Sequence, residues 1–174
     1  QDAGVERPED MIGKDDFAYL SPAEIIDNLC ACRKVGANYL LNVGPTAAGE
    51  IPAYEAAALS RSGDWVRLCG DLIYEGKPSV VKGQGDDFAL EVNGKTYLFI
   101  HNLAIAGHGS VTVGVGGAGP RAFSGLNEKI SSARWLDNDE ELSFTQDADS
   151  GLFCLDATGY QYGVNLVVRV AELS

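Results

Sequence analysis

Adjacent carboxylates are the first residues in this sequence that could do chemistry. They occur at Asp15-Asp16 and at Asp139-Glu140-Glu141. Two carboxyl groups that flank a glycosidic bond can cleave it, one as the nucleophile and the other as acid and base. Both runs lie in polar, loop-like surroundings, which favours solvated acids over a poised pair. We therefore expect no catalytic residue within this chain.

The two histidines, His101 and His108, stand seven positions apart with no acid or cysteine beside them. This pattern is typical of surface residues rather than of a metal site, so we predict no metal. A Ser-His-Asp or Cys-His arrangement would have to use the same two residues, and nothing in the sequence supports one.

Gly114, Gly116 and Gly119 match the spacing of a dinucleotide fingerprint after an apparent strand. That fingerprint requires a helix directly afterwards, and the stretch beginning at Pro120 is not a helix start. We predict a glycine-rich loop between strands and no nucleotide cofactor.

Composition narrows the classes of partner. The chain has 174 residues, 45% of them hydrophobic, and a net charge of −12. An acidic surface repels phosphate backbones, so we expect no nucleic acid. The sequence has no apolar run of about 18 residues, so we expect no membrane partner. It begins at Gln1 rather than Met, which indicates a cut or a processed end.

The cysteines favour a reducing compartment. Cys30 and Cys32 lie two apart in a predicted helix and point to different sides, so they cannot chelate one metal. Cys69 and Cys154 have apolar neighbours, as buried free thiols do. We expect the bacterial cytoplasm rather than secretion, with a disulfide between distant cysteines as the alternative.

The first half of the chain reads as helix, strand, helix. Ser21-Pro22-Ala23-Glu24 predicts a capped helix start, and Gly36 its end. The nearly continuous apolar run 38–43 is typical of a parallel strand buried on both faces. Pro52 opens a second helix that Gly70 ends, with Trp65 on its apolar face.

This helix, strand, helix order is the repeating unit of an α/β barrel or a doubly wound sheet. A single such strand leaves two bare edges, whereas a complete barrel has eight strands. We therefore interpret residues 1–78 as the C-terminal segment of a (β/α)8-like barrel whose remaining strands lie outside this sequence.

Residues 79–174 are predicted to form an antiparallel β-sandwich. The runs 88–92 and 96–100 flank Asn93-Gly94, the strongest short hairpin signal. Six or seven short strands separated by turns fit this architecture. The other strand candidates are residues 111–115, 131–136, 142–145, 152–155 and 164–173.

Residues 36–78 carry the most specific pattern. Residues 36–52 read G-A-N-Y-L-L-N-V-G-P-T-A-A-G-E-I-P, followed by G-D-W-V at 63–66, G-D-L-I-Y at 70–74 and Pro78. This stretch resembles glycoside hydrolase family 29, the α-L-fucosidases, whose pattern is G-N-x-L-L-N-x-G-P-x-x-x-G-x-I-P, then G-x-W-L and G-E-x-I-Y. Ala37 and Asp71 depart from the family's Gly and Glu.

The resemblance implies a retaining α-L-fucosidase with an N-terminal barrel and a C-terminal β-sandwich. Such an enzyme hydrolyses terminal fucose from glycans with two carboxylates and no metal or organic cofactor. Its nucleophile and its fucose-binding histidines map to no residue here. The implied partners are the N-terminal barrel portion of the same enzyme and a fucosylated glycan.

Asn42 is the candidate site residue of this chain. It is the last polar residue of the predicted strand, and barrel active sites lie at the C-terminal ends of strands. We expect its amide to bond loop backbone beneath the site, with direct contact to the sugar as the alternative. Gly44 and Pro45 are predicted to set the sharp exit turn.

A second function class stays open, namely a non-catalytic carbohydrate-binding or scaffold module. A β-sandwich alone would fit it, although the helical half fits it badly. Six aromatic residues could form a sugar-binding platform, and we expect most of them to be core instead. They are Phe123, Trp135, Phe144, Phe153, Tyr160 and Tyr162.

Overall fold

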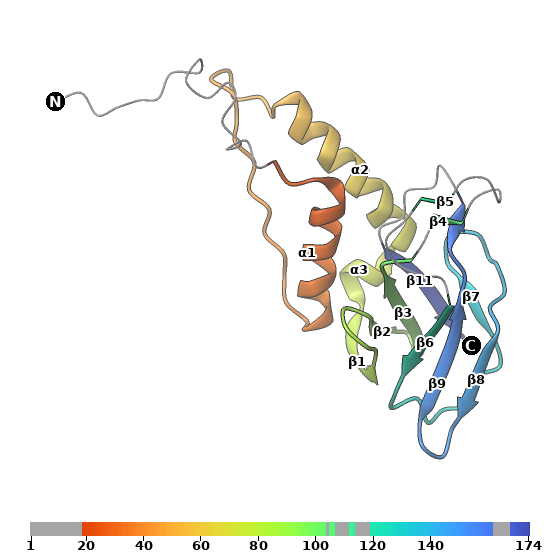
Figure 1. Cartoon of the computed structure of the whole chain (residues 1–174). Helices are drawn as coiled ribbons and strands as arrows, with labels where there is room; N and C mark the ends of the chain where they lie inside the picture. The colour runs from red at the N-terminus through yellow and green to blue at the C-terminus, as the bar shows by residue number, and fades with distance from the viewer. Residues whose placement is uncertain (1–18, 104, 107–111, 114–118, 162–167) are drawn as a thin grey trace.

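The computed structural model describes residues 19–103, 105–106, 112–113, 119–161 and 168–174. Three helices precede the strands: α1 (Pro22–Lys34), α2 (Ala53–Cys69) and α3 (Asp71–Glu75). Figure 1 shows the long helices on one side of a set of antiparallel sheets. No described helix is long and apolar enough to cross a membrane.

The predicted signals at the helix ends are confirmed. The hydroxyl of Ser21 accepts a hydrogen bond from the backbone N–H of Glu24 at 3.2 Å, and the Ser21 N–H donates to the Glu24 carboxylate at 2.7 Å. These bonds from Ser21 hold the pKa of Glu24 below its usual value. Pro52 and Gly70 flank α2 as expected.

The largest sheet has five strands in the order β1-β2-β3-β11-β7, all antiparallel to their neighbours. The predicted hairpin at Asn93-Gly94 is confirmed, and both residues adopt the positive φ that this turn requires. The strands are β1 (Lys77–Lys82), β2 (Phe88–Val92), β3 (Lys95–His101), β7 (Ala133–Trp135) and β11 (Val168–Leu173).

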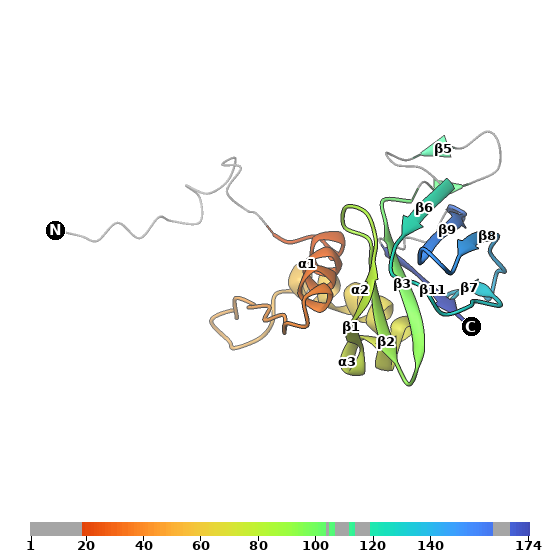
Figure 2. The same ribbon diagram turned by 90° about the horizontal axis from the view of Figure 1, so that it is seen from below.

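Two smaller sheets complete the described β-structure. The first has the order β6-β9-β8, formed by β6 (Gly119–Phe123), β8 (Phe144–Asp147) and β9 (Leu152–Ala157). The second has the order β10-β4-β5, formed by β4 (Ile105–Ala106), β5 (Thr112–Val113) and β10 (Tyr160–Gln161), with β10 parallel to β4. Figure 2 shows the sheet of β6, β9 and β8 across from β3 and β11.

The five-stranded sheet is covered on both faces, which makes three layers. Leu98 and Ile100 of β3 join the cluster between the sheets, which includes Phe123, Trp135 and Phe153. Phe99, between them in sequence, belongs to a second cluster with the helices. Its members are Ile26, Cys30, Trp65, Cys69, Leu72, Ile73, Phe88, Leu90, Phe99, Val168 and Val170. The alternation of side chains along a strand places these residues on opposite faces.

The predicted strand at residues 38–43 is wrong for this structure. The segment has no regular secondary structure, and the side chain of Leu40 is 83% exposed. A strand forms only when its N–H and C=O groups pair with a neighbour, and no described strand lies beside this segment. The described part therefore shows helices and mostly antiparallel sheets, with β10 and β4 as the parallel pair, and the predicted barrel strand is not among its strands.

The predicted domain boundary between residues 78 and 79 falls within β1, which begins at Lys77. No strand was predicted at this position. The glycine-rich stretch contains β6, starting at Gly119, while Gly114 and Gly116 lie outside the described residues. His101 was expected at the surface and is instead buried at the end of β3, where Asp87 and Phe88 lie beside it and Val168 is its strand partner.

Candidate functional site

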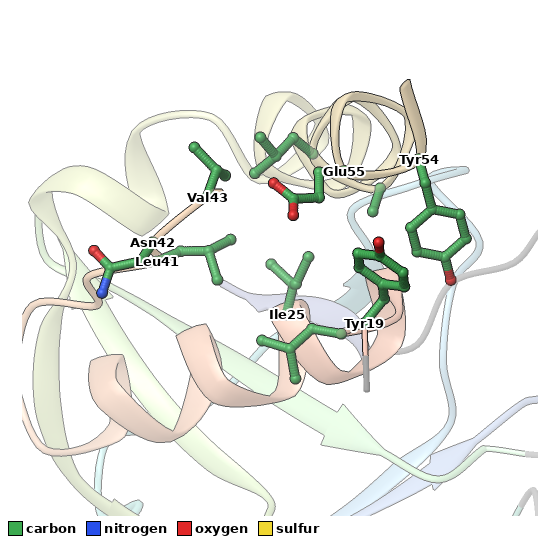
Figure 3. A pocket seen from close by; sticks show the side chains of 10 residues that line it. Tyr19, Ile25, Leu41, Asn42, Val43, Tyr54 and Glu55 are labelled. Atoms are coloured by element: carbon green, nitrogen blue, oxygen red, sulfur yellow. The ribbon is translucent and has the colours of Figure 1, made fainter. Parts of the chain in front are cut away.

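A cavity of about 230 Å³ lies between the N-terminal ends of α1 and α2 and the segment 41–43 (Figure 3). Six of its ten lining residues have apolar side chains, and the others are two tyrosines, one asparagine and one glutamate. It is lined by Tyr19, Leu20, Ile25, Leu41, Asn42, Val43, Tyr54, Glu55, Ala58 and Leu59. A concave apolar site with a few polar groups is the usual form of a binding pocket.

Glu55 binds the backbone at Gly44, directly after the segment 41–43 that lines the cavity. Its Oε2 accepts a hydrogen bond from the backbone N–H of Gly44 at 3.1 Å. The loop beyond is closed by bonds of 2.8 Å from the Thr46 N–H to the Glu50 carbonyl and from the Gly49 N–H to the Thr46 carbonyl. The exit from segment 41–43 is thus fixed by Glu55 and Thr46.

Asn42 lines the cavity and is exposed. Figure 3 shows its amide directed away from the carboxylate of Glu55 and from the ring of Tyr19. The amide makes no hydrogen bond to the described residues, so its predicted bond to loop backbone stays a prediction. Gly44 and Pro45 lie immediately before the hydrogen-bonded turn at Thr46.

The described residues provide no pair of carboxylates for glycoside cleavage at this cavity. Glu55 is the single carboxylate among the residues that line it. The run 139–141 lies elsewhere, where Glu141 pairs with Arg134 at 3.2 Å and Glu140 accepts a hydrogen bond from the Thr158 hydroxyl at 3.0 Å. Asp15, Asp16 and His108 lie outside the described residues.

Trp65 has a packing role, as its position on the apolar face of α2 predicts. Its side chain is 3% exposed, and its indole N–H donates to the carbonyl of Val168 at 2.8 Å. Its ring meets Phe99 edge-on at 6.4 Å between centroids. Trp65 therefore joins α2 to β11 and faces no cavity that could hold a sugar.

The aromatic platform considered for a binding module is largely core. Phe123, Trp135 and Phe153 are at most 1% exposed, and Phe144 stacks on Phe153 at 5.0 Å between centroids. The side chains of Tyr160 and Tyr162 lie outside the described set. Four of the six candidates thus serve packing.

Metal and thiol chemistry find little support in the described part of the chain. Its His, Cys, Asp and Glu residues form no group of three or more that could hold a metal ion. All four cysteines are free. Burial raises the pKa of the Cys69 thiol to about 12 and shifts that of Cys30 in the same direction, so both stay protonated at neutral pH.

Comparison with known proteins gives a consistent family. The model of the family described as alpha-L-fucosidase matches residues 12–71. The tissue alpha-L-fucosidase of Mus musculus is 39% identical over 61 residues, which are 35% of this chain and 14% of the relative. The alpha-L-fucosidase of Dictyostelium discoideum is 31% identical over 88 residues, or 49% of this chain and 19% of the relative.

Solved structures extend the likeness to the β half. Alpha-L-fucosidase isoenzyme 1 from Paenibacillus thiaminolyticus superposes with a TM-score of 0.70 and 26% identity over 92% of this chain and 36% of its own. A GH29 alpha-L-fucosidase from Bacteroides thetaiotaomicron gives a TM-score of 0.69 with 19% identity, over 90% of this chain and 33% of its own.

This chain thus spans about a third of the solved enzymes and less than a fifth of these two curated relatives. The motif at residues 36–78 and the fold of the larger part of the chain agree in pointing to one group of proteins. Residues 12–71 thus match the alpha-L-fucosidase family, and the chain is similar in fold to a part of solved alpha-L-fucosidases.

Proposed function

We propose that the parent protein is a retaining α-L-fucosidase that hydrolyses terminal α-L-fucose from glycans. In this proposal residues 1–78 complete its (β/α)8-like barrel and residues 79–174 supply its β-sandwich. The nucleophile and the acid/base carboxylate come from the part of the enzyme outside this sequence. A retaining enzyme needs those carboxyl groups about 5–5.5 Å apart, and the cavity described above offers one carboxylate.

The observation that carries the proposal is the exposed segment 38–43. Its sequence matches the family motif, and its Leu40 is 83% exposed. Exposed apolar surface next to unpaired backbone is the property of a strand whose neighbours are elsewhere. The rest of the barrel is the partner that would cover it. The Bacteroides neighbour was solved as a trapped covalent intermediate with a fluorinated fucosyl fluoride, which supports the retaining course.

The test is an assay of the full-length parent with an aryl α-L-fucoside. We expect release of the aryl group with retention at the anomeric carbon. If the parent does not cleave this substrate but cleaves a different aryl glycoside, the assignment of fucose as its substrate is wrong.

The chain alone should show no turnover, because its described residues place one carboxylate, and no pair, at the cavity. Adding a fragment that holds the remaining barrel should restore activity by covering residues 38–43. Steady turnover by the isolated chain, free of any barrel fragment, would contradict the assignment of the catalytic groups to another part.

Asn42 is proposed to support the mouth of the completed barrel. Asn42→Ala in the full enzyme should lower kcat/KM, through either sugar contact or loop support. Unchanged kinetics and unchanged stability would remove Asn42 from the site. The free thiols support a further proposal, that the enzyme works in a reducing compartment such as the bacterial cytoplasm.

A further inference from the structure

A second cavity, of about 270 Å³, opens between α1 and the C-terminal end of β3. Figure 2 shows α1 alongside the β1 and β2 side of the large sheet. It shares no residue with the first cavity, and six of its seven lining residues have polar side chains. The lining residues are Asp27, Asn28, Ala31, Lys34, Asp86, His101 and Asn102.

His101 is the buried member of this wall, with 7% of its surface exposed. Its Nδ1 is inaccessible to solvent and has no hydrogen-bond partner among the described residues. Asp87 Oδ1 lies 3.5 Å from Nδ1 and already accepts the backbone N–H of His101 at 2.8 Å. The imidazole of His101 therefore lines the cavity with one ring nitrogen that no described residue hydrogen-bonds.

The rim of the cavity presents both acceptors and donors. Asp27 and Asp86 are exposed carboxylates, and Asn28 and Asn102 are exposed amides. Lys34 donates from Nζ to the carbonyl of Gly85 at 2.8 Å and keeps two further N–H groups. Partial burial raises the pKa of Asp27, and the negative charge of Asp86 adds to that shift while His101 opposes it. A ligand that donates a hydrogen bond to Asp27 would offset this cost.

We propose that this cavity binds a single monosaccharide unit through its hydroxyl groups. Each hydroxyl both donates and accepts, so it can use the carboxylates, the amides and the Lys34 ammonium together. An ammonium ligand could use the acceptors alone. The cavity is smaller than the roughly 300–1,000 Å³ of drug-sized sites, which fits one sugar ring. The inference does not depend on the reaction of the parent enzyme.

The test is proton NMR of the intact chain, whose two histidines give few imidazole signals. A His108→Gln variant assigns the signals of His101. L-Fucose and D-galactose are titrated as probes, with methylammonium chloride as the cationic alternative. We expect a saturable shift of the His101 signals with at least one sugar, at a dissociation constant on the order of millimolar.

Asp27→Asn should weaken that binding about tenfold, since it replaces a charged acceptor by a neutral one. Glu128→Gln, a matched change outside the cavity lining, should leave it unchanged. Both variants should keep the thermal midpoint of the parent chain within a few degrees, which shows that the fold is intact.

A lack of saturation with either sugar would overturn the proposal. The proposal would also be overturned if the Asp27→Asn variant bound the sugar as tightly as the parent chain, because the response would then arise outside this cavity. A saturable response to methylammonium alone would reassign the cavity to cations. None of these outcomes bears on whether the parent cleaves fucosides, so the two proposals fail separately.

Discussion

Residues 38–43 and strand β3 are two apolar runs of similar composition with opposite fates. Both contain Tyr-Leu followed by further apolar residues. In β3, Leu98, Phe99 and Ile100 are fully buried, between β2 and β11 and between two layers. In the other run, Leu40 is 83% exposed. The difference lies in neighbours, because a strand needs backbone partners as well as apolar side chains.

The largest effect should come from Trp65, which fastens the helical region to the sheet. Trp65→Ala should lower the free energy of unfolding by about 3–5 kcal/mol, since it leaves a cavity and an unpaired carbonyl at Val168. Urea unfolding measures this loss. Tyr54→Ala on the exposed part of the same helix is the control, expected to change stability by about 0.5 kcal/mol or less. Equal effects would show that α2 is not anchored through Trp65.

The next effect compares the two apolar runs directly. Leu98→Ala should cost about 2–5 kcal/mol, whereas Leu40→Ala should stay within about 0.5 kcal/mol in this chain. With the rest of the barrel present, Leu40→Ala should become as costly as a core substitution. Thermal unfolding checks this for the unsubstituted chain and its two variants, and for the full enzyme with and without Leu40→Ala. A large cost of Leu40→Ala in the isolated chain would mean that residues 38–43 are covered in solution.

A smaller effect is expected at the loop that leaves the exposed run. Glu55→Ala removes the acceptor of the Gly44 N–H and should speed hydrogen exchange of that amide by about tenfold. Glu55→Gln keeps an acceptor oxygen and should restore most of the protection. Exchange rates that are identical in all three proteins would show that this loop is held by the turn at Thr46 alone.

The smallest effect concerns the charge of Asp27. Its pKa is raised above the ordinary 3.8, so the ionised carboxylate is less favourable in the folded state than in the unfolded one. The stability this group contributes is present at low pH and is lost as pH rises through the carboxyl range. Asp27→Asn should therefore raise stability slightly at pH 7 and leave it unchanged at pH 3. Urea unfolding at both pH values gives the comparison, and a loss at pH 7 would contradict it.

Local signals were enough to predict much of the fold. The capping box at Ser21 and Glu24 needs residues three apart, and the hairpin at Asn93 needs two adjacent ones. Trp65 could be assigned to packing because helical periodicity alone places it on the apolar face of α2. Asn42 was singled out as the last polar residue of the predicted strand; it lines the first cavity, and its role in a site stays a prediction.

The rest depends on contacts between distant segments. Residues 77–82 carry no clear strand signal, because Pro78 lacks the backbone N–H that a ladder needs and fits only an edge strand. β1 exists because β2 lies beside it. His101 is buried because Asp87, 14 positions before it, and its strand partner Val168, far along the chain, lie beside it. Residues 38–43 show the reverse case, where the local pattern predicted a strand whose neighbours the chain does not contain.

The position of β11 between β3 and β7 also constrains the order of assembly. Val168 pairs with His101, and Ala171 pairs with both Leu98 and Trp135. The middle of the large sheet is therefore closed by residues that leave the ribosome last among those described. Until then, β3 has one open edge and the indole N–H of Trp65 lacks its acceptor at Val168. Long-range closure of this kind slows folding, so the nascent chain must be protected from aggregation until β11 emerges.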